Sequence, residues 1–115
     1  SSAASDVYKR QAEMVDLTPE ESAMVRKAVR LCELCMLETM HPDKINLASL
    51  GNMVPHVHWH VIARYKDDAF FPDSIWSPRR RTCSQEVLEE RRARAKTMLE
   101  KLPSLLMSLE KISPE

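Results

Sequence analysis

The stretch HVHWHVI, at residues 56–62, decides both the fold and the chemistry that we expect of this chain. It contains three of the four histidines, at alternate positions, with valine and tryptophan between them. A period of two, together with β-branched and aromatic residues, is typical of a half-buried β-strand. We therefore expect a strand over residues 55–65 that carries His56, His58 and His60 on one face.

The spacing along a strand limits what these histidines can bind. Residues two apart are separated by ~6.6 Å and residues four apart by ~13 Å. Neighbouring imidazoles can therefore contact one group, whereas His56 and His60 cannot both ligate one ion unless the strand bends. A row of this length suits an extended, multiply charged group such as a polyphosphate better than a single metal ion. An ordinary imidazole is mostly uncharged at neutral pH and has a lone pair for nucleophilic attack or proton transfer.

The composition is that of one globular domain without a strong electrostatic field. The chain has 115 residues, and its 17 basic side chains balance its 17 acidic ones, so no net charge attracts it to nucleic acid or to a membrane. Nothing in the sequence predicts a membrane span or a secretory signal, and three cysteines without a repeating pattern fit reduced thiols. We expect a cytoplasmic protein that binds neither nucleic acid nor membrane.

Gly51 is the only glycine in the chain, which excludes one class of phosphate site. A Walker loop or a GxGxxG turn needs several glycines, so neither is present. Any phosphate must be held by side chains and by non-glycine backbone.

Local signals predict a long helix and a second strand before the histidines. Thr18 as N-cap, proline at the first helical position and Glu21 at the third predict a helix over residues 19–40, which ends at His41 because a residue before proline disfavours the helical region. Residues 44–50 alternate as a strand, with Asn46, Ala48 and Leu50 on one face, and Gly51-Asn52 is a plausible turn. The two strands are expected to pair antiparallel, and the sequence leaves open which face Asn46 shares with the histidines.

After a loop over residues 66–81, a second long helix is predicted from about Ser84 to residue 102. Pro103 then either kinks the helix or begins a new one. The prediction of only two strands is a shortfall, since an isolated hairpin is marginally stable in water. Either the helices cover the hairpin, or a partner chain completes the sheet, or strands are missing.

Residues 12–76 resemble the histidine triad (HIT) superfamily, whose signature is His-φ-His-φ-His-φ-φ with φ apolar, and residues 56–62 fit every position. The flanking residues 44–55 and 63–72 resemble small bacterial members of the diadenosine polyphosphate hydrolase type. The resemblance implies an α+β fold with an antiparallel sheet, and a homodimer. It also implies a nucleotide phosphohydrolase or nucleotidyl transferase that acts at an α-phosphate and needs no cofactor or metal. Dinucleoside polyphosphates and nucleoside phosphoramidates would be its substrates.

The resemblance also assigns roles to individual residues. His58 would be the nucleophile that forms a nucleotidyl-histidine, His56 would orient it, and His60 would contact the phosphate and the leaving group. Asn46 and Asn52 fall where relatives place side chains that bind phosphate. Met53 departs from the pattern, because well-known relatives have Ser or Thr there.

The beginning of the chain leads to a further expectation. The run Val7-Tyr8-Lys9-Arg10-Gln11 resembles a translated adapter sequence, so we expect residues 1–11 to be a non-native leader. The early strands of the family would precede Ala12 and are not seen. We therefore expect residues 12–112 to form a single, N-terminally truncated HIT domain with a C-terminal helical extension.

Other interpretations of the same residues are possible. The domain could bind nucleotide without turnover, or two neighbouring histidines could bind a metal ion with a third ligand such as His41. The histidines could also be chance residues of a surface strand. Asn46 could be an ordinary polar strand residue, and Asn52 a turn residue beside Gly51.

Three other features have a structural and a functional interpretation. Cys32-Glu33-Leu34-Cys35 has the spacing of redox and zinc motifs, but its place within a helical stripe favours buried packing. Arg79-Arg80-Arg81 could reach a phosphate, although a solvated run is the simpler interpretation. Trp76 could close over a site or simply pack.

Overall fold

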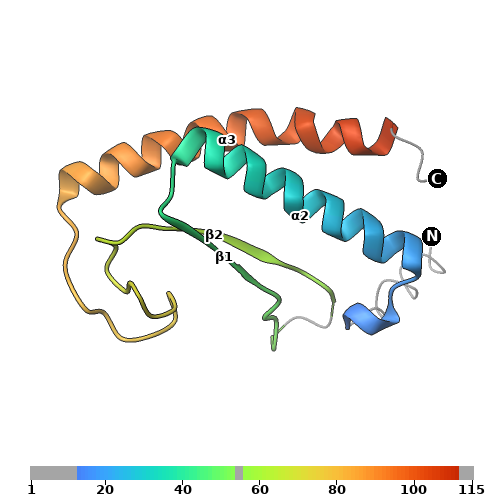
Figure 1. Cartoon of the computed structure of the whole chain (residues 1–115), viewed down its shortest axis with the longest axis horizontal. Helices are drawn as coiled ribbons and strands as arrows, with labels where there is room; N and C mark the ends of the chain where they lie inside the picture. Colours follow the sequence, from blue (N-terminus) through green and yellow to red (C-terminus); the bar gives the residue numbers. More distant parts are fainter. Residues whose placement is uncertain (1–12, 54–55, 112–115) are drawn as a thin grey trace.

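The computed structural model describes residues 13–53 and 56–111, with side chains as far as residue 109. The expected leader at residues 1–11 lies outside the described residues, as do residue 55 at the start of the predicted strand and residue 112 at the end of the predicted domain. In chain order the elements are η1 (Met14–Asp16), α2 (Pro19–Met40), β1 (Lys44–Ala48), β2 (His60–Arg64) and α3 (Gln85–Lys111) (Figure 1). None of the described helices is long and apolar enough to cross a membrane.

The first long helix, α2, begins and ends where the sequence predicts. The Thr18 hydroxyl accepts from the Glu21 N–H at 3.1 Å, and the Glu21 carboxylate accepts from the Thr18 N–H at 2.8 Å, which completes a capping box. At the other end, His41 adopts a left-handed conformation with φ of 47°, and the Tyr65 hydroxyl donates to the Met40 carbonyl at 2.6 Å. Both helix ends therefore have hydrogen-bond partners.

The second long helix, α3, extends beyond its predicted end at residue 102. It begins after Ser84, whose hydroxyl accepts from the Val87 N–H at 3.2 Å, and it continues through Pro103 to Lys111. An internal proline leaves the carbonyl four residues earlier without its donor. That carbonyl belongs to Leu99, which is 66% exposed, and Pro103 is exposed as well, so water can satisfy the group. The proline neither ends the helix nor begins a new one.

The sheet is the predicted antiparallel pair, but both strands are shorter than expected. They span residues 44–48 and 60–64 rather than 44–50 and 55–65, so His56 and His58 precede β2. One contact that replaces strand pairing there is a hydrogen bond of 3.1 Å from the Ser49 hydroxyl to the His58 carbonyl. Within the pair, Ala48 lies opposite His60 and Asn46 lies opposite Ile62. Since opposed residues share a face, Asn46 and His60 lie on the same side of the sheet.

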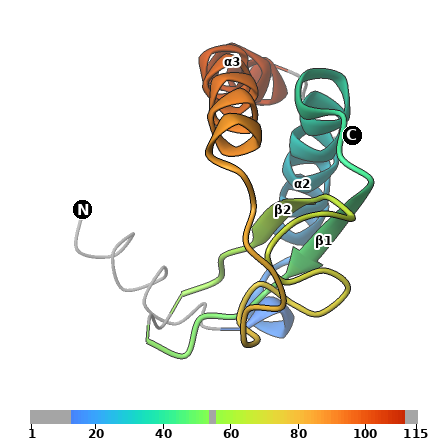
Figure 2. The same ribbon diagram turned by 90° about the vertical axis from the view of Figure 1, so that its left-hand side faces the viewer.

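Both helices lie on one side of the hairpin, where they form the core (Figures 1 and 2). The buried core residues come from α2 and α3, and the partly buried residues that pack against them include three from the strands: Cys35, Met36, Met40 and Met98, with Ile45, Val61 and Ala63. The opposite face carries Asn46, His60 and Arg64, and it is contacted by the loop between β2 and α3. The α+β architecture is thus confirmed, with helices covering one face of the two strands.

Two methionines provide a test of this core. Met36 is 5% exposed in the helix interface, whereas Met107 is 61% exposed on α3. We predict that Met36→Ala lowers the free energy of unfolding by roughly 2–5 kcal/mol, because a buried methionine loses its contacts and leaves a cavity. Met107→Ala serves as the matched control and should change it by less than about 0.5 kcal/mol. Urea unfolding followed by circular dichroism measures both, and equal transition midpoints would contradict this assignment of the core.

Candidate functional site

Four aromatic rings form a continuous row on the face of the hairpin that the helices leave open. The centroid of the Trp76 ring lies 5.4 Å from that of His60, His60 lies 5.3 Å from His58, and His58 lies 5.9 Å from His56. Each pair meets edge to face, with interplanar angles of 76°, 82° and 64°. The three imidazoles therefore lie side by side, as their alternation predicts, although two of them precede the strand.

One backbone carbonyl contacts two of these histidines. The Leu50 oxygen lies 2.5 Å from Nε2 of His58 and 2.9 Å from Nε2 of His60. A carbonyl oxygen only accepts, so both Nε2 atoms carry a hydrogen when both bonds are made. Nδ1 of His58 also faces a carbonyl, that of His56 at 3.2 Å. A neutral ring has a single N–H, so His58 in its neutral form donates to Leu50 or to His56, but not to both.

Gly51 lies directly against the His58 ring. A Cβ at this position would overlap the Cε1, Nε2 and Nδ1 atoms of the imidazole. Gly51 has no positive φ, so close approach, and not an unusual backbone conformation, explains the glycine. The sequence predicted only a turn here. The contact with His58 could not be seen without the fold.

A cleft of about 400 Å³ opens beside His58 and His60 and is lined by the residues that follow β1 together with Trp76. Asn52 lines this cleft and also a smaller, mostly polar pocket of about 100 Å³ that reaches His56. Its side chain makes no hydrogen bond to another described residue, so both its donors and its acceptor are available. Met53, which is 94% exposed, stands at the same cleft. Trp76 both packs on His60 and forms a wall of the cleft.

Asn46 lies on the same face as His60, two residue pairs further along the strands. Its Oδ1 accepts a hydrogen bond of 2.6 Å from Nη1 of Arg64, a side chain that is only 2% exposed. Arg64 was not among the predicted site residues. The available signal was its period-two spacing from His60, which places residues 60, 62 and 64 on one face.

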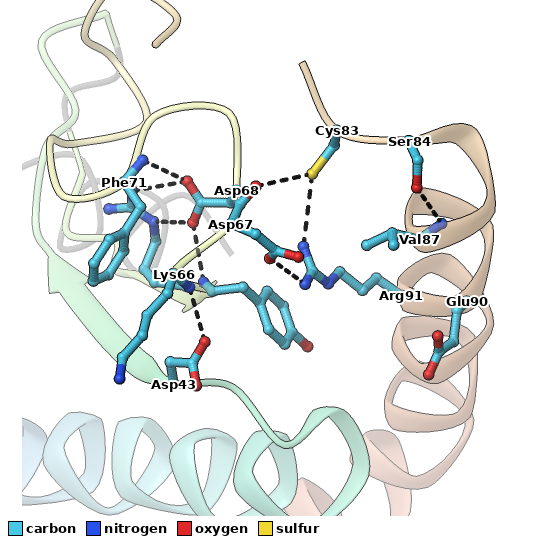
Figure 3. Close-up of polar contacts among 12 residues, drawn as sticks. Asp43, Lys66, Asp67, Asp68, Phe71, Cys83, Ser84, Val87, Glu90 and Arg91 are labelled. Atoms are coloured by element: carbon cyan, nitrogen blue, oxygen red, sulfur yellow. Dashed lines mark hydrogen bonds and ion pairs between the residues drawn. The ribbon is translucent and has the colours of Figure 1, made fainter. Parts of the chain in front are cut away.

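Arg64 also binds the loop that follows β2. Its Nε and Nη2 donate to the two carboxylate oxygens of Asp68 at 2.9 and 3.2 Å, and Nη2 donates to the Asp73 carbonyl at 2.6 Å. The Asp68 carboxylate accepts from three backbone N–H groups, those of Tyr65, Phe70 and Phe71. Figure 3 shows the contact between Asp68 and Phe71. Burial raises the pKa of Asp68, but the hydrogen bonds from Arg64 and from the backbone outweigh it and hold the pKa well below the usual range. Asp68 is therefore ionised and fixed.

Two of the three arginines at residues 79–81 hold this loop in place by an ion pair and hydrogen bonds. Arg80 pairs with the Asp73 carboxylate at 2.7 Å, and Arg81 donates to the carbonyls of Asp68 and Phe71 at 2.6 and 2.7 Å. Arg79 is exposed and lines a separate cavity of about 640 Å³ between the loop and α3. These contacts explain two of the three arginines without a phosphate ligand.

The other possible metal ligands from the sequence, Cys32, Cys35 and His41, lie elsewhere. Cys35 is a buried core residue. Burial, and secondly the neighbouring Cys35, raise the pKa of the Cys32 thiol, so both cysteines fit the interpretation of packing within the helix stripe of α2. His41 is exposed at the end of α2, next to the strand ends that pair Lys44 with Arg64 and away from His60. Among the described side chains, those of residues 13–53 and 56–109, no three of His, Cys, Asp or Glu are placed to hold a metal ion.

Comparison with known proteins identifies the family. The family model described as HIT domain matches residues 8–67, which is more than half of the chain. The chain therefore belongs to the HIT, or histidine triad, family. A search of curated proteins gave no significant match.

Solved structures of histidine triad proteins resemble this fold. The protein from Bradyrhizobium japonicum is 28% identical with a TM-score of 0.57, and the match covers 77% of this chain and 68% of that one. The protein from Sinorhizobium meliloti is 32% identical with a TM-score of 0.60, covering 78% and 65%. The protein from Marinobacter aquaeolei is 30% identical with a TM-score of 0.59, covering 80% and 68%. This chain thus spans about two thirds of the length of these relatives.

The ionised Asp68 should make the stability of the loop depend on pH. Because its folded pKa lies below the value of about 3.9 for an unfolded aspartate, its contribution is present above about pH 4 and is lost as the pH falls. We predict that Asp68→Asn destabilises the protein at pH 7 and that its difference from the wild type shrinks towards pH 2. Urea unfolding across this range measures the difference.

The exposed Glu100 provides a control for this measurement. Glu100→Gln should leave the stability within about 0.5 kcal/mol of the wild type throughout the pH range. An Asp68→Asn penalty that stays constant from pH 7 to pH 2 would show that the carboxylate does not carry the effect.

Proposed function

We propose that this protein hydrolyses or transfers nucleotidyl groups at an α-phosphate through a covalent intermediate on His58. Dinucleoside polyphosphates and nucleoside phosphoramidates are the substrates we propose. The observation that supports this most is the position of His58 in the ring row, at 5.3 Å from His60 and 5.9 Å from His56 by ring centroids, beside an open cleft. A nucleophile between two further imidazoles can attack phosphorus while its neighbours contact phosphoryl oxygens.

The first step requires a free lone pair on His58. With its hydrogen on Nδ1, which faces the His56 carbonyl at 3.2 Å, the ring presents an unprotonated Nε2. Nε2 attacks the α-phosphorus, a phosphorus–nitrogen bond forms, and the bond to the leaving group breaks with its electron pair on that group, which takes a proton from water. His60, Asn46 and Asn52 are the proposed donors to the phosphoryl oxygens.

The second step returns the enzyme to its starting state. In hydrolysis, the oxygen of a water molecule attacks the same phosphorus and loses a proton to solvent, while the bond from phosphorus to Nε2 breaks and its electron pair returns to His58 as a lone pair. In transfer, the hydroxyl of an acceptor replaces water.

The Leu50 carbonyl must move before this chemistry can begin. It lies 2.5 Å from Nε2 of His58, the atom that would attack, and it also accepts from His60. A bound phosphoryl group would replace it, with a phosphoryl oxygen accepting from His60 in its place. The carbonyl thus occupies the position in which the proposed mechanism needs the substrate.

A second candidate function is nucleotide binding without turnover. Two observations favour it: the Leu50 carbonyl against Nε2 of His58, and the apolar Met53 at the cleft, where a hydroxyl would otherwise assist a leaving group. In this case the histidine row would hold a nucleotide phosphate, and no covalent bond would form.

Substitution of His58 separates the two functions. We predict that His58→Ala lowers kcat for a dinucleoside polyphosphate by at least about 10³-fold and abolishes labelling of the protein by nucleotide radiolabelled at the α-phosphate, because the proposed nucleophile is removed. His41→Ala, which changes the histidine outside the row, should keep wild-type turnover.

Calorimetry completes this test. Saturable binding of nucleotide by the wild type without release of product would favour the binding module over the hydrolase. Full turnover by His58→Ala would contradict the covalent mechanism.

We further propose that the protein is a cytoplasmic homodimer. Leu34, Leu37 and Leu47 are each more than 40% exposed, and a second copy could cover such apolar side chains. The thiols of Cys32 and Cys35 lie within one helical turn and are free, which fits a reducing compartment. Sedimentation equilibrium should give twice the mass of the chain, and a monomeric mass at micromolar concentration would contradict the dimer.

A further inference from the structure

The guanidinium of Arg64 is held from three sides. Nε and Nη2 donate to the Asp68 carboxylate at 2.9 and 3.2 Å, Nη2 also donates to the Asp73 carbonyl at 2.6 Å, and Nη1 donates to Oδ1 of Asn46 at 2.6 Å. The side chain is 2% exposed, and its Cζ lies 5.6 Å from the centre of the Phe71 ring. A group that is buried, planar and bonded in this way has one orientation.

This fixed donor determines how the Asn46 carboxamide is turned. Arginine has donors and no acceptor, so the Asn46 atom that faces it must be the oxygen. Ile62 lies directly opposite Asn46, with Arg64 and His60 on the two diagonals. Since Oδ1 faces Arg64, the amino group lies at the other edge of the planar carboxamide, and His60 stands on the diagonal opposite Arg64.

We propose that Arg64 is a positioning residue that acts through Asn46. It fixes the carboxamide so that the amino group donates to a phosphoryl group bound at the histidine row, and this inference rests on the nucleotide function proposed above. Without Arg64 the carboxamide could turn by half a rotation and present its oxygen to the phosphate, which would repel it. The Asp68 carboxylate balances the charge of Arg64, so the phosphate meets a neutral amide donor and not the guanidinium.

A purely structural role makes a different prediction. If Arg64 only fastens the loop through Asp68 and Asp73, its loss would lower stability, and any effect on nucleotide binding would be independent of Asn46. If Arg64 acts through Asn46, the two residues must be coupled. A double-mutant cycle separates these possibilities, because residues that act as one unit are not additive.

The cycle uses Arg64→Lys, Asn46→Ala and the double variant, with kcat/KM for a dinucleoside polyphosphate and the affinity for adenosine 5′-monophosphate as readouts. We expect each single variant to lose about 100-fold in kcat/KM, and the double variant to be no worse than Asn46→Ala, because removal of one preorganised donor lowers the rate by on the order of 10²-fold or more. Equal losses from Arg64→Lys in both backgrounds would overturn the proposal. Arg80→Ala removes an exposed ion pair of the same loop, which contributes little to its stability, without touching Asn46, and it should keep wild-type kcat/KM.

A second variant keeps the proposal testable if Arg64→Lys fails to fold. Asn46→Asp retains an acceptor for Arg64 but replaces the amino group by a second oxygen. We expect it to fold as stably as the wild type and to bind adenosine 5′-monophosphate more weakly than Asn46→Ala does, because the carboxylate repels the phosphate. Wild-type affinity in Asn46→Asp would overturn the proposal.

Nuclear magnetic resonance tests the positioning separately from turnover. The side-chain amide of Asn46, assigned by its loss in Asn46→Ala, should be rigid in the wild type and clearly more mobile in Arg64→Lys, as measured by its ¹⁵N order parameter. An unchanged order parameter would overturn the proposal whether or not the enzyme is active. The protein could show no turnover while the Asn46 amide is rigid and the losses of nucleotide affinity are coupled. In that case the positioning role of Arg64 stands, and only the proposed hydrolase activity is excluded.

Discussion

The buried guanidinium of Arg64 is the interaction on which the candidate site depends. A charge at 2% exposure is costly unless it is paired and hydrogen bonded, and here the Asp68 carboxylate supplies the charge while Asn46 and the Asp73 carbonyl supply further acceptors. The same side chain thereby connects β1, β2 and the loop that carries Trp76. Since Trp76 packs against His60, the contacts of Arg64 with this loop also help to hold the wall of the cleft in place.

The two faces of the hairpin have different roles: one packs on the hydrophobic core, and the other carries residues of the candidate site. Ile45, Val61 and Ala63 face the helices and pack on the core, while Asn46, His60 and Arg64 face the other way. A slip of one residue between the strands would exchange these faces, so the burial that stabilises the fold also selects the register. That register is the one that places Asn46 beside His60. The packing of apolar residues on one side therefore determines the arrangement of polar groups on the other.

Local signals in the sequence predicted part of this structure, and long-range contacts determined the rest. Thr18 and Glu21 form their capping box within one turn, so the helix that they begin was predictable, as was the alternation that places three imidazoles side by side. The continuation of α3 through Pro103 depends on that residue facing solvent, and the burial of Arg64 depends on a loop that returns over the sheet. Neither follows from a local pattern. The roles of the histidines, Asn46 and Asn52, the leader at residues 1–11 and the truncated domain remain predictions.

The shared Leu50 carbonyl has a consequence for selectivity. It lies within hydrogen-bonding distance of Nε2 of both His58 and His60, so a molecule that enters between these rings must replace the hydrogen bonds that the carbonyl accepts in order to gain any. A phosphate ester has several oxygens with which to do so, whereas an uncharged nucleoside offers hydroxyls and ring atoms that are far weaker acceptors. Discrimination against uncharged nucleosides would thus begin with the hydrogen bonds of the Leu50 carbonyl, before any contact with the base or the sugar.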